Sequence, residues 1–184
     1  MTIPERISAL RKLMEERGYD VYMIPTDDFH QSEYVGDHFK VREYMTGFTG
    51  SAGTAIFTKD QAGLWTDGRY FLQAEQQLNG TGVKLYKMGE PGVPTEEEFI
   101  ASVLPENGTL GFDGRVIAIE EGTALEAAVA AKNGKINYSE ALVDKVWTDR
   151  PALSEKPAFD LGEEYTGEST ESKSDRVRKA MKKA

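Results

Sequence analysis

The stretch from Thr54 to Phe71 reads T-A-I-F-T-K-D-Q-A-G-L-W-T-D-G-R-Y-F and carries the strongest indication of the fold. Two runs rich in β-favouring and aromatic residues, 54–58 and 63–66, flank a short polar turn, which is typical of a β-hairpin. Asp67 stands directly after the second run, where an N-cap is expected for a helix that ends at Asn79-Gly80. We therefore predict a hairpin whose second strand leads straight into a helix.

A helix and a buried strand are expected upstream of the hairpin. Thr2 and Glu5 have the spacing of a capping box, and Gly18 is placed to end the helix that they begin. The run D-V-Y-M-I-P from Asp20 to Pro25 is apolar and lies between a helix stop and a proline, which is typical of a short buried strand. A helix followed by a buried strand indicates an α/β unit.

Helices and strands alternate downstream of the hairpin as well. A capped helix is predicted from Thr95 and an alanine-rich helix from Ile119, and part of the segment before the hairpin is also expected to be helical. The further predicted strands are 83–88, 109–112 and 135–138. This alternation around one hairpin predicts an α/β fold, with a mixed sheet covered by helices on both faces.

The periodic pattern weakens after the last predicted strand. We expect a first domain over residues 1–151 and a polar, acidic linker over 152–173. Residues 174–184 regain helical spacing, and V-R-K-A-M-K-K at 177–183 matches L-R-K-L-M-E-E at 10–16 in residue type. We interpret 174–184 as the first helix of a truncated second domain that resembles the first. Chance similarity between two short amphipathic helices is the alternative.

Composition disfavours several classes of protein. The net charge is −9 and the basic residues are scattered except near the end of the chain, so the basic patch required for nucleic-acid binding is not evident. No apolar run reaches the roughly 20 residues of a membrane span, and the N-terminus lacks a signal-peptide pattern, so a cytoplasmic location is predicted. The absence of cysteine excludes disulfides, thiolate catalysis and cysteine-ligated metals.

One segment concentrates side chains that are able to bind a metal. These residues are Asp27, Asp28, His30, Glu33 and His38. They lack the H-E-x-x-H and D-x-D-x-D-G spacings, so we interpret them as a polar loop in which Asp28 and Ser32 make local turn hydrogen bonds. A site for a hard cation or zinc is the alternative. The chain has only two histidines, neither in a catalytic context, so we assign it no catalytic residue and no metal site.

Two further motifs border the hairpin. The glycine-rich run Gly47–Gly53 lacks the G-K-[ST] of a phosphate loop and precedes a strand, so its glycines are interpreted as allowing tight turns and close packing. Arg69 falls in the first turn of the predicted helix, where a cation is unfavourable. It is therefore expected to pair with Asp67 or a neighbouring carboxylate, or to project toward a carboxylate of a substrate or subunit.

Four strings in order resemble the amino-terminal domain of Xaa-Pro aminopeptidases. They are H-Q-S-E-Y (30–34), T-G-F-T-G-S-A-G-T (46–54), L-W-T-D-G-R-Y-F-L-Q-A (64–74) and L-V-D-K-V-W-T-D-R-P (142–151). The resemblance implies a creatinase/prolidase N-terminal fold, with a mixed sheet of roughly six strands and ribonuclease H-like topology. The fold does not imply ribonuclease activity.

The resemblance also implies what the parent protein does. Members of this family remove an N-terminal residue that precedes proline, using two divalent metal ions, usually manganese, held by a catalytic domain that this chain lacks. The amino-terminal domain would restrict substrate access and support assembly, so its expected partners are its own C-terminal domains, a second subunit and proline-containing peptides. The residues expected to face the catalytic domain are Arg69, Tyr70, Asp67, Phe48 and His38. On this basis the chain alone is expected to be inactive.

Two alternative functions stay open at this point. A free-standing module could recognise peptides or another protein through the surface around Phe48 and Arg69. A prolidase-like or creatinase-like enzyme would carry the same N-terminal fold, although W-T-D-G-R-Y-F and V-W-T-D-R-P are more similar to the aminopeptidases.

Overall fold

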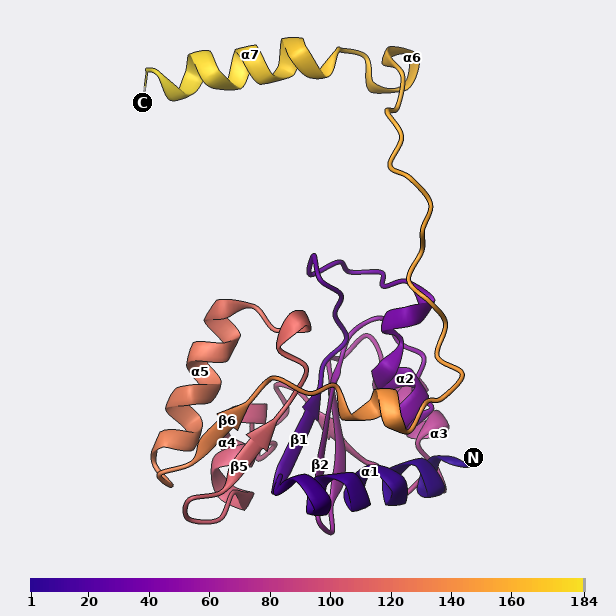
Figure 1. The fold of residues 1–184 in the computed structure, drawn as a ribbon, viewed down its shortest axis with the longest axis vertical. Helices are drawn as coiled ribbons and strands as arrows, with labels where there is room; N and C mark the ends of the chain where they lie inside the picture. The colour runs from indigo at the N-terminus through magenta and orange to yellow at the C-terminus, as the bar shows by residue number, and fades with distance from the viewer. Residues whose placement is uncertain (184) are drawn as a thin grey trace. The chain divides into compact units, whose positions relative to one another are not determined.

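A computed structural model describes residues 1–183 of the chain. The chain forms two compact units. The first unit spans Met1–Ala152 and contains the sheet with its flanking helices. The second unit begins at Leu153, and its described residues contain two helices. Figure 1 shows the succession of elements within each unit.

Helices and strands alternate in the first unit, as the sequence predicts. Its α-helices are α1 (Ile3–Arg17), α2 (Val41–Thr46), α3 (Phe71–Gln77), α4 (Glu96–Val103) and α5 (Ile119–Ala130). Its strands are β1 (Val21–Ile24), β2 (Thr54–Thr58), β3 (Ala62–Thr66), β4 (Lys84–Lys87), β5 (Thr109–Gly111) and β6 (Lys135–Asn137). Three short 3-10 helices are η1 (Asp37–Phe39), η2 (Gly114–Val116) and η3 (Leu142–Lys145).

The strands form one six-stranded mixed sheet in the order β4-β3-β2-β1-β5-β6. The predicted hairpin is confirmed, because Thr54 pairs with Trp65 and Phe57 with Ala62 in an antiparallel register. Strand β2 is also antiparallel to β1, and the remaining pairs are parallel. Every strand except β2 therefore ends at the same side of the sheet, which we call the carboxyl edge.

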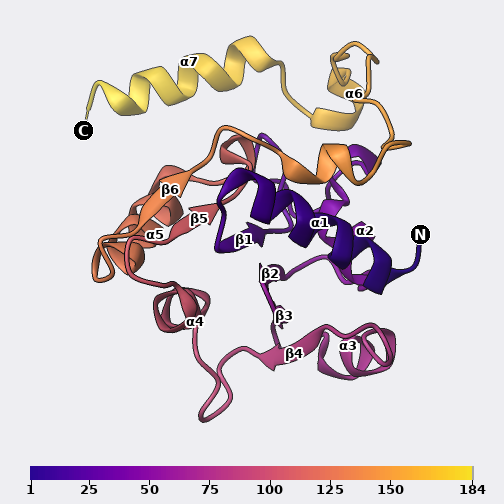
Figure 2. The same cartoon turned by 60° about the horizontal axis from the view of Figure 1, so that its bottom comes forward.

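Strands β1, β2, β3 and β4 each contribute side chains to two separate apolar cores, whereas β5 and β6 contribute only to the second of them. In β1, Tyr22 and Ile24 belong to the core beneath α1 and α2, whereas Val21 and Met23 belong to the core beneath α4 and α5. This split follows from the alternation of side chains along a strand. Figure 2 shows the sheet between these two groups of helices. The predicted α/β fold with helices on both faces is confirmed.

The local signals at the helix ends are also confirmed. The Glu5 carboxylate accepts a hydrogen bond from the Thr2 amide at 2.7 Å, and Gly18 ends α1 in the left-handed conformation with a φ of 72°. Thr95 and Glu98 form the same reciprocal cap at the start of α4. Such caps satisfy amide groups that a helix N-terminus would otherwise leave unpaired.

The structure corrects two predicted helix starts. Helix α3 begins at Phe71, so Asp67 is not its N-cap; its carboxylate closes the preceding turn instead. In the second unit, α7 (Thr170–Met181) begins four residues before the predicted Ser174, because the Ser169 side chain accepts a hydrogen bond from the Ser172 amide.

The second unit is described by itself. The segment predicted as a linker contains the short helix α6 (Glu163–Thr166) in addition to the first turn of α7. The apolar side chains of Phe159, Val177 and Met181 are exposed. The prediction that the helix continues to the end of the chain is corrected, because α7 ends at Met181 with Lys182 as its C-cap; Ala184 itself lies outside the described residues. In the part of the chain that the structure describes, no helix combines the length and apolarity of a membrane span.

Candidate functional site

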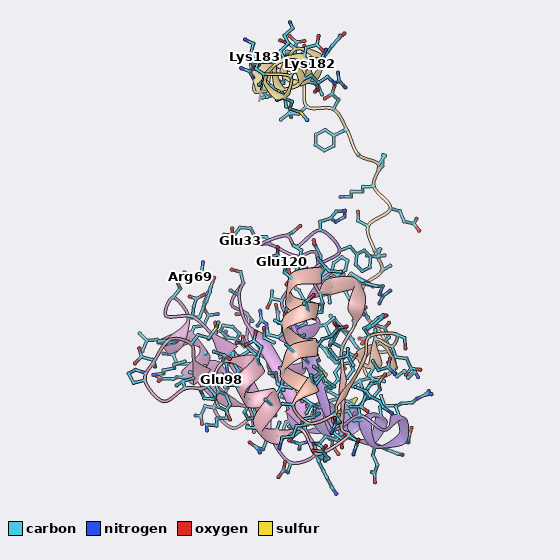
Figure 3. The ribbon with its side chains drawn as sticks, turned by 90° about the vertical axis from the view of Figure 1, so that its left-hand side faces the viewer. Glu33, Arg69, Glu98, Glu120, Lys182 and Lys183 are labelled. Atoms are coloured by element: carbon cyan, nitrogen blue, oxygen red, sulfur yellow. The ribbon has the colours of Figure 1, made fainter. Side chains whose placement is uncertain are left out.

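The carboxyl edge collects the motifs that the sequence singled out. The polar loop follows β1, the Asp67-Gly68-Arg69 turn follows β3, and the glycine-rich run ends where β2 begins. Because β2 is antiparallel to its neighbours, its start lies beside their ends. Figure 3 shows Arg69, Glu33 and Glu120 along this edge.

Asp67 and Arg69 form a closed turn at the end of β3. One carboxylate oxygen of Asp67 accepts hydrogen bonds from the Arg69 amide at 3.0 Å and from its Nε at 2.9 Å. The other oxygen accepts from Nη2 at 2.8 Å. These bonds lower the pKa of Asp67. The predicted ion pair is therefore present, and the Arg69 side chain keeps 61% of its surface exposed.

Tyr70 joins this turn to the glycine-rich run. Its hydroxyl lies 2.7 Å from the Ser51 hydroxyl, and the Arg69 guanidinium lies 5.2 Å from the centre of its ring. The Phe48 ring meets the Tyr70 ring edge to face at 5.8 Å. Phe48 is fully buried, so its side chain is not exposed to a partner and packs against Tyr70 inside the domain. We call Asp67, Arg69 and Tyr70 the arginine face.

His38 belongs to a different set of contacts. Its Nδ1 lies 2.7 Å from the carbonyl oxygen of Pro151, and its own carbonyl accepts a hydrogen bond from Arg150 Nε at 2.7 Å. Its ring packs on Phe39. The structure therefore brings together four of the five predicted site residues and places His38 in a contact group of its own.

Sequence reasoning missed a second turn of the same kind. Asp113-Gly114-Arg115 follows β5, and its three hydrogen bonds of 3.1, 2.9 and 2.8 Å repeat those between Asp67 and Arg69. Burial would raise the pKa of Asp113, but the bonds from Arg115 outweigh it and lower that pKa. The repeated D-G-R string was the available signal.

Several carboxylates at this edge influence one another. Burial, and then the charge of Asp28, raise the pKa of Asp27 to about 6. Burial raises the pKa of Glu121 to about 7, with contributions from Asp27, Glu96 and Glu97. Sequence reasoning could not identify this group, because its members come from a loop and two helices far apart in the chain.

The polar loop after β1 behaves as a turn. Asp28 Oδ1 accepts hydrogen bonds from the amides of His30 at 2.8 Å and Ser32 at 3.1 Å, which confirms the predicted local bonds. Within residues 1–183, no three His, Cys, Asp or Glu side chains converge in a way that could hold a metal ion. The side chains present in residues 1–183 therefore do not fit a metal centre.

The comparison with known families identifies one matching family model. The creatinase/prolidase N-terminal domain matches residues 6–146. Among curated relatives, aminopeptidase P2 of Arabidopsis thaliana is 46% identical over 153 residues, which are 81% of this chain and 21% of that protein. A probable Xaa-Pro aminopeptidase P of Coprinopsis cinerea is 40% identical over 181 residues, 97% of this chain and 29% of that protein. The chain thus spans less than a third of these relatives.

Solved structures show the same relationship. The X-prolyl aminopeptidase from Caenorhabditis elegans, a cytosolic enzyme with a di-nuclear active site, matches with a TM-score of 0.88 and 33% identity. The match covers all of this chain and 31% of that one. The Xaa-Pro dipeptidase from Bacillus anthracis matches with a TM-score of 0.59 and 23% identity over 79% of this chain and 36% of that one, a likeness of fold alone.

Proposed function

The chain belongs to the creatinase/prolidase N-terminal domain family, and from that premise we propose that it is the non-catalytic N-terminal domain of a metal-dependent Xaa-Pro aminopeptidase. The parent enzyme would remove an N-terminal residue that precedes proline. Two divalent metal ions, manganese in this proposal, would be held by a catalytic domain outside this chain. The chain itself would restrict substrate access and support assembly.

The aminopeptidase assignment is supported by the pattern of similarity. Identity to curated aminopeptidases P reaches 46%, and the Caenorhabditis elegans aminopeptidase matches the whole chain. The dipeptidase structure matches less of the chain and at lower identity. A prolidase-like parent is therefore the less favoured alternative. A cytoplasmic location is supported by the cytosolic relative.

The arginine face is the observation that carries the proposed supporting role. Arg69 is exposed, yet Asp67 and the Tyr70 ring set its orientation before any partner binds. A guanidinium held in one orientation suits a planar carboxylate, because less conformational entropy is lost when the two groups pair. The expected partners are a peptide substrate, the chain's own C-terminal domains or a second subunit.

The role of Arg69 is tested in the full-length protein. We expect Arg69→Ala to lower kcat/KM for an Xaa-Pro peptide by about tenfold, or to weaken assembly, because one charge-assisted contact is lost. Arg115→Ala is the matched control, since it removes the same pair of side-chain hydrogen bonds to an aspartate in the turn after another strand. Wild-type kinetics and mass for Arg69→Ala, or equal losses in both variants, would contradict a specific role for Arg69.

The absence of catalysis is tested with the 184-residue chain. Incubated with manganese and an Xaa-Pro peptide, this chain should give no turnover above the buffer rate. Substantial turnover by the purified chain would refute its assignment as a non-catalytic domain.

A further inference from the structure

Arg42 is the one buried cation among the described residues. It lies on α2 with only 3% of its surface exposed. Burial lowers the pKa of its guanidinium to about 10, so the group stays charged at neutral pH. It makes no ion pair with any carboxylate of residues 1–183, since no pair within 4.0 Å includes it. A buried charge without a counter-ion is costly, and an apolar side chain of similar size would avoid that cost.

The hydrogen-bond acceptors of the guanidinium are neutral groups of two loops, and the charge of Glu43 acts on it only from beyond ion-pair distance. Its Nη1 donates to the carbonyl oxygen of Phe48 and its Nη2 to that of Gly50. Its Nε donates to the Thr26 hydroxyl at 2.7 Å, and this hydroxyl donates in turn to the carbonyl oxygen of Gly53 at 2.7 Å. The Phe48 ring lies 4.7 Å from the guanidinium carbon. One side chain thus holds the segment Phe48–Gly53 directly at two points and through Thr26 at a third.

The segment Phe48–Gly53 is also the segment that Tyr70 contacts. Ser51 lies between the held carbonyls, and its hydroxyl contacts the Tyr70 hydroxyl. The Phe48 ring supports the Tyr70 ring. The space around Gly50 is also filled, because a Cβ there would lie 2.3 Å from the Phe48 ring and 2.8 Å from the Tyr70 ring. A displacement of this segment would therefore move Tyr70, and Arg69 with it.

We propose that Arg42 is a positioning residue that fixes the segment Phe48–Gly53 and, through Ser51 and Tyr70, sets the orientation of Arg69. This inference rests on the proposed function of the arginine face. Lysine cannot replace Arg42, because a single ammonium group lacks the planar fork that reaches two carbonyls and a hydroxyl together. Thr26 is the second member of this arrangement and couples the loop after β1 to the same segment.

The positioning is tested first by hydrogen exchange on the 184-residue chain. Arg42→Lys keeps the charge but removes donors to the backbone carbonyls of this segment, so the segment should open more often. We therefore expect amide hydrogen exchange in 48–53 to become about tenfold faster. Arg11→Lys is the matched control, since Arg11 Nε also donates to a backbone carbonyl, that of Thr58, at 2.9 Å. Unchanged exchange in 48–53, or an equal change in the control, overturns the proposal. If Arg42→Lys does not fold, Thr26→Val tests the same segment by removing only the relaying hydroxyl.

The second test uses the full-length protein and separates this inference from the proposed function. We expect Arg42→Lys and Arg69→Ala each to lower kcat/KM by about tenfold, and the double variant to lose no more than Arg69→Ala alone, because Arg42 acts through Arg69. Methylguanidine should restore activity to Arg42→Ala, and methylammonium should not. If the losses in kcat/KM are additive in the double variant, or if only Arg69→Ala lowers kcat/KM, the role of Arg42 is overturned. The proposed role of the arginine face is then unaffected. Unchanged kinetics and unchanged mass in Arg69→Ala, with faster exchange in Arg42→Lys, would refute the proposed role of the arginine face and support the positioning of the segment.

Discussion

Replacing Glu121 by glutamine should stabilise the chain above neutral pH. Glu121 lies in the first turn of α5, partly buried, with Asp27, Glu96 and Glu97 as the charges that act on it. Burial and these charges raise its pKa from 4.5 to about 7. The folded state therefore binds this proton more tightly than the unfolded state, so the contribution of Glu121 to stability is full below pH 4.5 and is lost as pH rises through about 7.

The magnitude follows from this difference in pKa. A rise from 4.5 to about 7 corresponds to an upper limit of roughly 3 kcal/mol at high pH. Partial exposure and solvent screening reduce this value substantially, and the helix N-terminus favours a carboxylate by roughly 0.3–1 kcal/mol. We therefore expect Glu121→Gln to raise the free energy of unfolding by about 1 kcal/mol at pH 8 and to change it little at pH 4.

Urea unfolding of both proteins between pH 4 and pH 8 measures this difference, with pH values chosen on either side of the pKa of Glu121. Glu126→Gln is the matched control, since Glu126 is exposed on the same helix. Its effect should stay within roughly 0.5 kcal/mol at every pH. The reasoning would be refuted by a Glu121→Gln protein that is no more stable than wild type at pH 8, or by a gain that does not depend on pH.

Two further substitutions test the packing around the site. Gly50→Ala should cost roughly 1–3 kcal/mol and loosen Tyr70, because the added Cβ meets two aromatic rings, whereas Gly36→Ala has free space and should be neutral in the same unfolding assay. Trp65→Ala should cost roughly 3–5 kcal/mol, because Trp65 is fully buried, stacks on Tyr86 at 4.0 Å and donates to the carbonyl of Pro94. A loss no larger than that of Trp147→Ala, whose side chain is only partly buried, would contradict this estimate.

Local features of the fold could be predicted because they depend on residues close together in sequence. The caps at Thr2 and Thr95 need only a partner three residues away, and the hairpin needs only two runs and a turn. The helix after β3 was predicted correctly, but the predicted position of its first residue was wrong. Asp67 resembles an N-cap in sequence, but its carboxylate is occupied by Arg69 two residues later, and the helix begins at Phe71.

The sequence by itself determined the helix caps, the hairpin and the alternation of helices and strands. These features are stabilised by contacts between residues that are neighbours along the chain. Only the tertiary structure decided that Tyr70 rests on Ser51, that His38 contacts Pro151 instead of the arginine face, and that Arg42 is buried. Each of these contacts joins residues of different elements, so it exists only after the sheet has brought those elements together. Burial then changes the chemistry of a side chain such as Glu121 or Arg42 in a way that residue type alone does not reveal.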